Sequence, residues 1–144
     1  MLAQLAIGCC MILATTVVHG FATLVGTRIL RRHYARLSRR RSDLHDTMAI
    51  ALYVLWLFLA TVTEVWMWAG LYSFLGVLGS LEEALYFSTV TFSTLGYGDI
   101  VLGPSWRLLA AFQAANGLFL FGWSTALVFL VVERLYEVRT GDKR

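Results

Sequence analysis

Long apolar blocks separated by short polar segments set the pattern of this sequence. Three blocks, at about residues 2–27, 47–68 and 106–132, are long enough to cross a bilayer as a helix, which takes roughly 20 residues. A fourth apolar segment, residues 81–92, is too short to cross. The pattern therefore predicts an all-α membrane protein with three transmembrane helices.

The overall composition supports a membrane protein. Of the 144 residues, 58% are hydrophobic and 15% are charged, whereas soluble domains are about 45–50% apolar. We expect one domain without a separate soluble module.

The first block is not expected to be a signal peptide, because no basic residue precedes it and its apolar run is too long. Cys9 and Cys10 are expected to be packing residues, since no metal-ligand spacing surrounds them.

The basic residues predict the orientation of the helices. Eleven of the twelve lie in two clusters, one after the first apolar block and one after the third. Lysine and arginine accumulate in cytoplasmic segments. We therefore expect an integral plasma membrane protein with its N-terminus outside and its C-terminus in the cytoplasm. The segment between the second and third blocks is then also outside.

The basic segment, residues 28–46, is expected to lie on the cytoplasmic membrane surface. Leu30, Tyr34 and Leu37 fall on one face of a helix, which is typical of an interfacial amphipathic helix. The opposite face carries arginines that can bind anionic lipid, namely Arg28, Arg32, Arg36 and Arg39. A role in topology alone, in which the arginines only keep this loop from crossing the membrane, is favoured over an added role in lipid binding or gating. A voltage sensor is not expected, because doubled arginines break the regular spacing along the segment.

The short apolar segment has the signals of a helix that starts at a defined point. Ser80 and Glu83 fit a capping box, which predicts a helix over residues 81–92. Its two N-terminal acids suit the positive end of the helix dipole. A short helix followed by a glycine-rich strand predicts a re-entrant loop, which needs surrounding protein or a water-filled pore at membrane depth.

The six residues after this helix have the pattern of a cation filter, Thr94-Leu95-Gly96-Tyr97-Gly98-Asp99. A potassium ion that sheds its water needs replacement oxygens, which backbone carbonyls on one axis supply. Aligning successive carbonyls requires some positive φ angles, and Gly96 and Gly98 adopt these at little cost. One chain supplies a quarter of each oxygen cage, so we expect a homotetramer. The expected K⁺ ligands belong to residues Thr94, Leu95, Gly96 and Tyr97, with Gly98 completing the filter.

These motifs resemble the potassium channel pore module of the two-helix and two-pore-domain group. The resemblance covers roughly residues 47–135. It implies a pore module at 47–136, with an outer helix at 47–70, a pore helix at 81–92, a filter at 94–99 and an inner helix at 105–136. A short cytoplasmic tail, 137–144, would follow. The helix at 1–27 is additional to that plan, and we expect it to pack on the outer helix.

The resemblance also implies roles for residues around the filter. Asp99 would lie at the outer mouth, and Leu95 replaces the commoner valine or isoleucine. Tyr86 or Phe87 would support the filter from behind, and only Tyr86 can donate a hydrogen bond to Asp99. Val90 stands where some members have a buried glutamate, so one carboxylate contact with Asp99 is missing.

The inner helix carries the positions expected to move and to line the pore. By resemblance, Gly117 matches a hinge glycine, and close helix packing is the alternative interpretation. Leu118, Phe121 and Thr125 match positions that line a water-filled cavity below the filter.

Three polar residues within the apolar blocks each allow two interpretations. Asn116 either makes an interhelical hydrogen bond or tunes the pore. Glu64 either pairs with Arg107 or reaches the membrane interface. His19 is either a packing residue or a pH sensor.

The function predicted from these features is passive, potassium-selective conduction. A non-selective cation channel and a non-conducting regulatory membrane subunit are the alternatives. An enzyme is not expected, because no catalytic constellation lies at a water-accessible position. Neither a cofactor nor a nucleic acid partner is expected.

Overall fold

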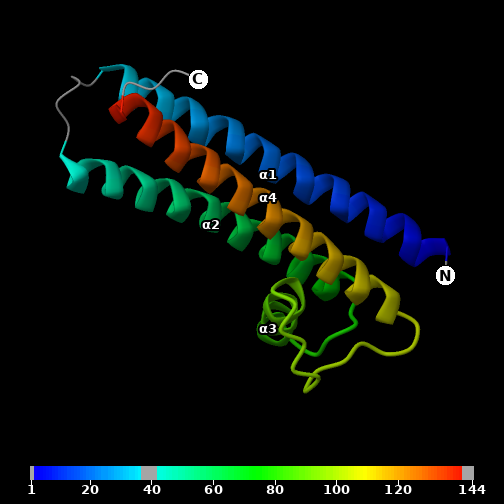
Figure 1. Ribbon diagram of the computed structural model, residues 1–144. Helices are drawn as coiled ribbons and strands as arrows, with labels where there is room; N and C mark the ends of the chain where they lie inside the picture. The colour runs from blue at the N-terminus through cyan, green and yellow to red at the C-terminus, as the bar shows by residue number, and fades with distance from the viewer. Residues whose placement is uncertain (1, 37–41, 141–144) are drawn as a thin grey trace.

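The computed structural model describes residues 2–36 and 42–140, and these residues form four helices without any strand. The helices are α1 (Leu2–Arg36), α2 (Asp43–Phe74), α3 (Leu81–Phe92) and α4 (Arg107–Thr140). Figure 1 shows α1, α2 and α4 as a bundle of long helices, with the short α3 at one end. Each long helix contains a stretch that is long and apolar enough to cross a membrane: Leu2–Tyr34, Asp43–Phe74 and Arg107–Glu137. The predicted all-helical fold with three such helices is confirmed for the described residues.

The long helices extend further than the apolar pattern predicted. Helix α1 continues through the basic segment to Arg36 without a break after residue 27. Arginine is a good helix former, and residues 28–36 contain no glycine or proline that would end a helix. Helix α2 begins at Asp43 with Ser42 as its N-cap, and α4 runs on to Thr140. The residues between 28 and 36 are therefore the end of a long helix and not a separate one.

The arginines expected to bind lipid are only partly described. Arg28 and Arg32 are exposed on α1. Arg36 belongs to the last turn of α1, and its side chain lies outside the described part of the chain. Arg39 lies entirely outside the described residues.

Helix α3 occupies the predicted range. The Ser80 hydroxyl accepts a hydrogen bond from the Glu83 N–H at 3.1 Å, as the capping box predicted. The Glu83 carboxylate accepts in turn from the Gly79 N–H at 2.9 Å, one residue earlier than in the standard box. Two backbone donors at the start of α3 are thereby satisfied.

The core lies where α2, α3 and α4 meet. Trp68 and Tyr72 of α2 pack with Phe87 of α3, and the Tyr72 and Phe87 rings meet edge to face at 5.2 Å. Many large apolar side chains remain exposed on the outer faces of the long helices, including Phe21 and Phe58. Such faces are suited to lipid or to neighbouring protein.

Both described basic regions lie at one end of the bundle. The last turns of α4 lie beside the C-terminal end of α1, and α3 lies at the opposite end with the start of α1 (Figure 1). Arg28, Arg31 and Arg32 of α1 therefore share an end with Arg134 of α4. This is the arrangement that the distribution of basic residues predicted.

Candidate functional site: the segment after helix α3

The backbone after α3 alternates in conformation. Thr94, Gly96 and Gly98 have positive φ angles of 59°, 57° and 77°. The positive angles predicted at the two glycines are confirmed, and Thr94 adopts one as well. Every second residue from 94 to 98 is therefore in the left-handed region.

The start of this segment is tied to the last turn of α3. The Leu95 N–H donates to the Val90 carbonyl at 3.0 Å, and the Gly96 N–H reaches the same oxygen at 3.4 Å. Two amide groups thus point back at the helix, which leaves the carbonyl groups of the segment free of helical bonding. The Leu95 and Tyr97 side chains are 58% and 67% exposed in the single chain.

Asp99 is held by a side chain from α3. The Tyr86 hydroxyl donates to the Asp99 carboxylate at 2.6 Å. This bond holds the pKa of Asp99 below its usual range and raises the pKa of the Tyr86 phenol. Of the two aromatic residues proposed to support the segment, Tyr86 therefore makes the hydrogen bond, while Phe87 is buried in the core.

A cavity lies behind the segment. It has a volume of about 300 Å³ and is lined by Val90, Asp99 and Arg107, among others. Val90 is 8% exposed and contributes no polar group at this position. The Arg107 guanidinium donates to the Leu102 carbonyl at 3.4 Å, which connects the first turn of α4 to the loop after the segment.

A buried polar network that the sequence analysis missed holds α3 in place. Gln113 of α4 accepts from the Tyr72 hydroxyl of α2 at 2.7 Å and donates to the Ser88 hydroxyl of α3 at 2.7 Å. Ser88 in turn donates to the Val65 carbonyl of α2 at 2.7 Å. All three side chains are fully buried. Gln113 is a polar residue within an apolar block, and that signal was available in the sequence.

Helix α4 packs closely against the end of α3 at Gly117. A methyl group at Gly117 would overlap the Phe92 carbonyl oxygen and lie 2.8 Å from its carbon. Gly117 is thus a point of close packing, and its predicted role as a hinge is not tested. Leu118, Phe121 and Thr125, the positions expected to line a cavity, are 65% exposed, 38% exposed and exposed, respectively.

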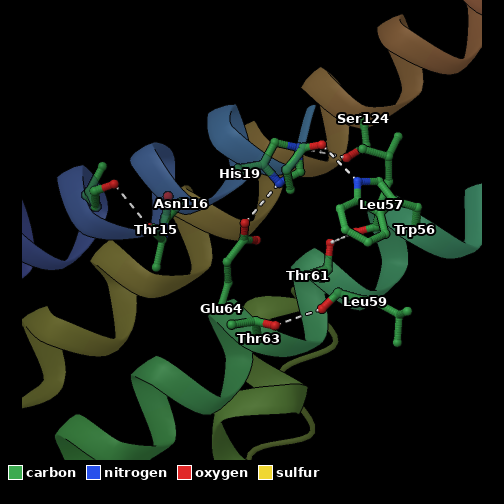
Figure 2. A network of polar contacts seen from close by, with 12 residues as sticks. Thr15, His19, Trp56, Leu57, Leu59, Thr61, Thr63, Glu64, Asn116 and Ser124 are labelled. Atoms are coloured by element: carbon green, nitrogen blue, oxygen red, sulfur yellow. Dashed lines mark hydrogen bonds and ion pairs between the residues drawn. The ribbon is translucent and has the colours of Figure 1, made fainter. Parts of the chain in front are cut away.

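Asn116, Glu64 and His19, the three polar residues for which the sequence allowed two interpretations, each contact a side chain of another helix (Figure 2). The Asn116 amide donates to the Thr15 hydroxyl of α1 at 2.7 Å, so the predicted interhelical hydrogen bond is confirmed. Glu64 contacts His19 at 2.9 Å and is fully buried. Both predictions for Glu64 are therefore wrong: it neither pairs with Arg107 nor reaches the interface. The additional helix α1 supplies the partner of Glu64, which is His19.

Metal ligands of the usual kind do not cluster in the described part of the chain. No group of three or more His, Cys, Asp or Glu side chains is placed there to hold a metal ion.

Comparison with known proteins places the chain in a family. No curated protein and no solved structure matches it significantly. A family model described as "Ion channel" matches residues 49–134, which span α2, α3, the segment after α3 and most of α4. The match covers more than half of the chain, and the chain belongs to this ion channel family.

Proposed function

We propose that the chain is a subunit of a potassium-selective channel, with residues 94–99 as its selectivity filter. The observation that carries the proposal is the alternation of positive φ angles at Thr94, Gly96 and Gly98 directly after α3. A potassium ion requires several oxygens aimed at one axis, and a backbone that alternates in this way is able to present successive carbonyls on one side.

The proposed ion ligands are the backbone carbonyls of Thr94, Leu95, Gly96 and Tyr97, with the Thr94 hydroxyl at the inner end. Helix α3 supports cation binding here, because the negative end of a helix dipole lies at its C-terminus, directly before Thr94. Gly98 leads the chain out of the filter toward Asp99 at the outer mouth.

Four chains would complete the filter. One chain offers only one wall of an oxygen cage, so we propose a homotetramer around the filter axis. The exposed Leu95 and Tyr97 side chains support this, because a neighbouring subunit can cover them. The exposed face of α4, with Leu118, Phe121 and Thr125, would then line a cavity below the filter.

The proposed setting is a plasma membrane, with α3 as a re-entrant pore helix at the outer face. The basic ends of α1 and α4 lie at the opposite end of the bundle, and basic residues favour the cytoplasmic side. Exposed Arg28 and Arg32, together with Arg36 and Arg39, are proposed to bind anionic lipid there.

Substitution of one glycine tests the filter. Gly96→Ala places a side chain at a φ of 57°, which strains the backbone and misaligns carbonyls, so we expect loss of K⁺ flux from proteoliposomes. Gly103→Ala is the matched control, because its methyl would meet no atom within 4 Å and its φ is ordinary. Unchanged flux in Gly96→Ala would contradict the proposed filter.

Reversal potentials distinguish the remaining candidates. In a bilayer with a K⁺/Na⁺ gradient, we expect the purified protein to reverse near the potassium equilibrium potential. A reversal near zero would instead identify a non-selective cation channel. Absence of current under every condition would identify a non-conducting regulatory subunit.

A further inference from the structure

Three helices meet at a buried polar contact that includes none of residues 94–99. His19 of α1 contacts the Glu64 carboxylate of α2 through Nδ1 at 2.9 Å, and its Nε2 lies 3.1 Å from the Ser124 hydroxyl of α4. Figure 2 shows His19 between the other two side chains. His19 and Glu64 are both fully buried, so this contact is shielded from water and from lipid.

The surroundings of the contact are apolar or neutral. In the spans 2–27, 47–74 and 108–132, His19 and Glu64 are the only histidine, acidic or basic residues. The Trp123 ring of α4 lies edge-on to the His19 ring at 5.5 Å. Thr61 lies one turn before Glu64 on α2, and its hydroxyl bonds to its own helix. No described charged group other than this pair therefore compensates a charge at the site.

The unsatisfied oxygen of Glu64 indicates what the site binds. Its Oε1 meets His19, but its buried Oε2 has no hydrogen-bond partner among the described residues. A carboxylate with a single hydrogen bond is costly in a low-dielectric interior unless its charge is compensated. One proton shared between Nδ1 and Oε1, with Nε2–H donating to Ser124, leaves the pair with no net charge.

We propose that His19, Glu64 and Ser124 form an intramembrane proton-binding site that fastens α1 to α2 and α4. With one shared proton, the site is neutral and all three helices are joined. Loss of that proton leaves a net charge of −1 on the pair, and uptake of a second proton leaves +1. Either charge is unfavourable in this environment, so α1 packs best when one proton is bound.

The proton-binding site lies next to the face of α4 that would line the pore. A groove of about 320 Å³ between α2 and α4 is lined by Thr61, Ser124 and Thr125, among others. Ser124 contacts His19, whereas Thr125 lies about 100° further around the helix and is exposed. The groove therefore adjoins Ser124, the residue of α4 that contacts His19. A displacement of α1 also acts on α4 next to the proposed cavity position, and this coupling rests on the proposed channel function.

Nitrogen NMR of ¹⁵N-histidine-labelled protein in lipid bilayers tests the site without any ion flux. The chain has three histidines, and His19→Gln identifies which signals belong to His19. In the wild type we expect these signals to show one proton shared between Nδ1 and the Glu64 carboxylate. In Glu64→Gln, the His19 signal should change to that of a neutral ring. A His19 signal that is unaffected by Glu64→Gln would overturn the proposal.

Flux measurements test the coupling to the pore. We expect K⁺ flux to change by about fivefold or more when the pH is high enough to remove the shared proton or low enough to add a second one. A change of about this size is typical of coupled sites. Glu64→Gln and His19→Gln should both flatten this dependence. Thr15→Val is the control, because it removes the other polar link between α1 and α4, to Asn116, without removing a titratable group. Asp99 is already ionised at alkaline pH, so the alkaline side of the dependence belongs to the His19–Glu64 site alone. An alkaline dependence retained in Glu64→Gln, or absent from the wild type, would overturn the coupling even if NMR supports the site.

Discussion

Gly117 of α4 lies directly against the backbone of Phe92, the last residue of α3. The absence of a side chain at Gly117 lets the two helices meet at this point, since a methyl group would overlap the Phe92 carbonyl oxygen. This contact fixes the end of α3 two residues before Thr94. The position of the proposed filter therefore depends on a close approach between the two helices.

Gly117→Ala is expected to destabilise the protein by about 1–3 kcal/mol, the usual cost of overpacking. The measurement is thermal unfolding of the detergent-solubilised protein. Gly122→Ala is the control, because an added methyl there would meet no atom within 4 Å. Equal stability of the two variants would contradict the packing role of Gly117 and favour the hinge interpretation.

Tyr86→Phe removes the hydrogen bond to Asp99, and we expect it to raise the pKa of Asp99. In the wild type the bond lowers that pKa. Its stabilising contribution is therefore complete above the ordinary pKa of an aspartate and is lost as the pH falls through the lowered value. K⁺ flux of Tyr86→Phe should consequently begin to fall at a higher external pH than flux of the wild type.

Asp99→Asn provides the matched control for this pH dependence. An asparagine cannot be protonated in this range, so the acid-induced loss attributed to Asp99 should be absent. If Tyr86→Phe and the wild type lose flux at the same pH, the hydrogen bond does not control the ionisation of Asp99.

Two buried tyrosines of α2 should respond differently to loss of their hydroxyl groups. Tyr72→Phe leaves the Gln113 oxygen without its donor, and an unsatisfied buried acceptor costs about 1–3 kcal/mol. The Tyr53 hydroxyl is buried with no partner among the described residues, so Tyr53→Phe should be neutral or stabilising. Thermal unfolding compares the two variants directly, and a larger loss in Tyr53→Phe would refute the role of the Gln113 network.

The elements that could be predicted from the sequence depend on local signals. The bounds of α3 follow from Ser80 and Glu83, which lie at its own N-terminus. The positive φ angles at Gly96 and Gly98 follow from the freedom of glycine. The long helices follow from the length of their apolar blocks, although their ends extend beyond those blocks into polar residues.

The contacts that could not be predicted depend on how helices pack. His19 and Glu64 are 45 residues apart in the chain, and no pattern indicated that α1 would bring them together. The network around Gln113 likewise needs α2, α3 and α4 at once.

Substitution of Thr94 distinguishes the backbone stability of the proposed filter from its ability to bind ions. It is a β-branched residue at a φ of 59°, a conformation that costs about 1–3 kcal/mol. Thr94→Gly relieves this strain, which offsets the roughly 0.5–1 kcal/mol by which glycine destabilises a folded backbone. The variant should therefore unfold at or above the wild-type temperature.

Ion conduction should nevertheless suffer in Thr94→Gly, because the proposed innermost ring of hydroxyl oxygens is lost. We expect reduced K⁺ flux and a reversal potential that moves toward zero in a K⁺/Na⁺ gradient. Thr94→Ser keeps the hydroxyl and should retain selectivity. Selective conduction by Thr94→Gly at the wild-type level would show that the Thr94 hydroxyl is not an ion ligand, while leaving the carbonyl ligands of the filter to be tested by Gly96→Ala.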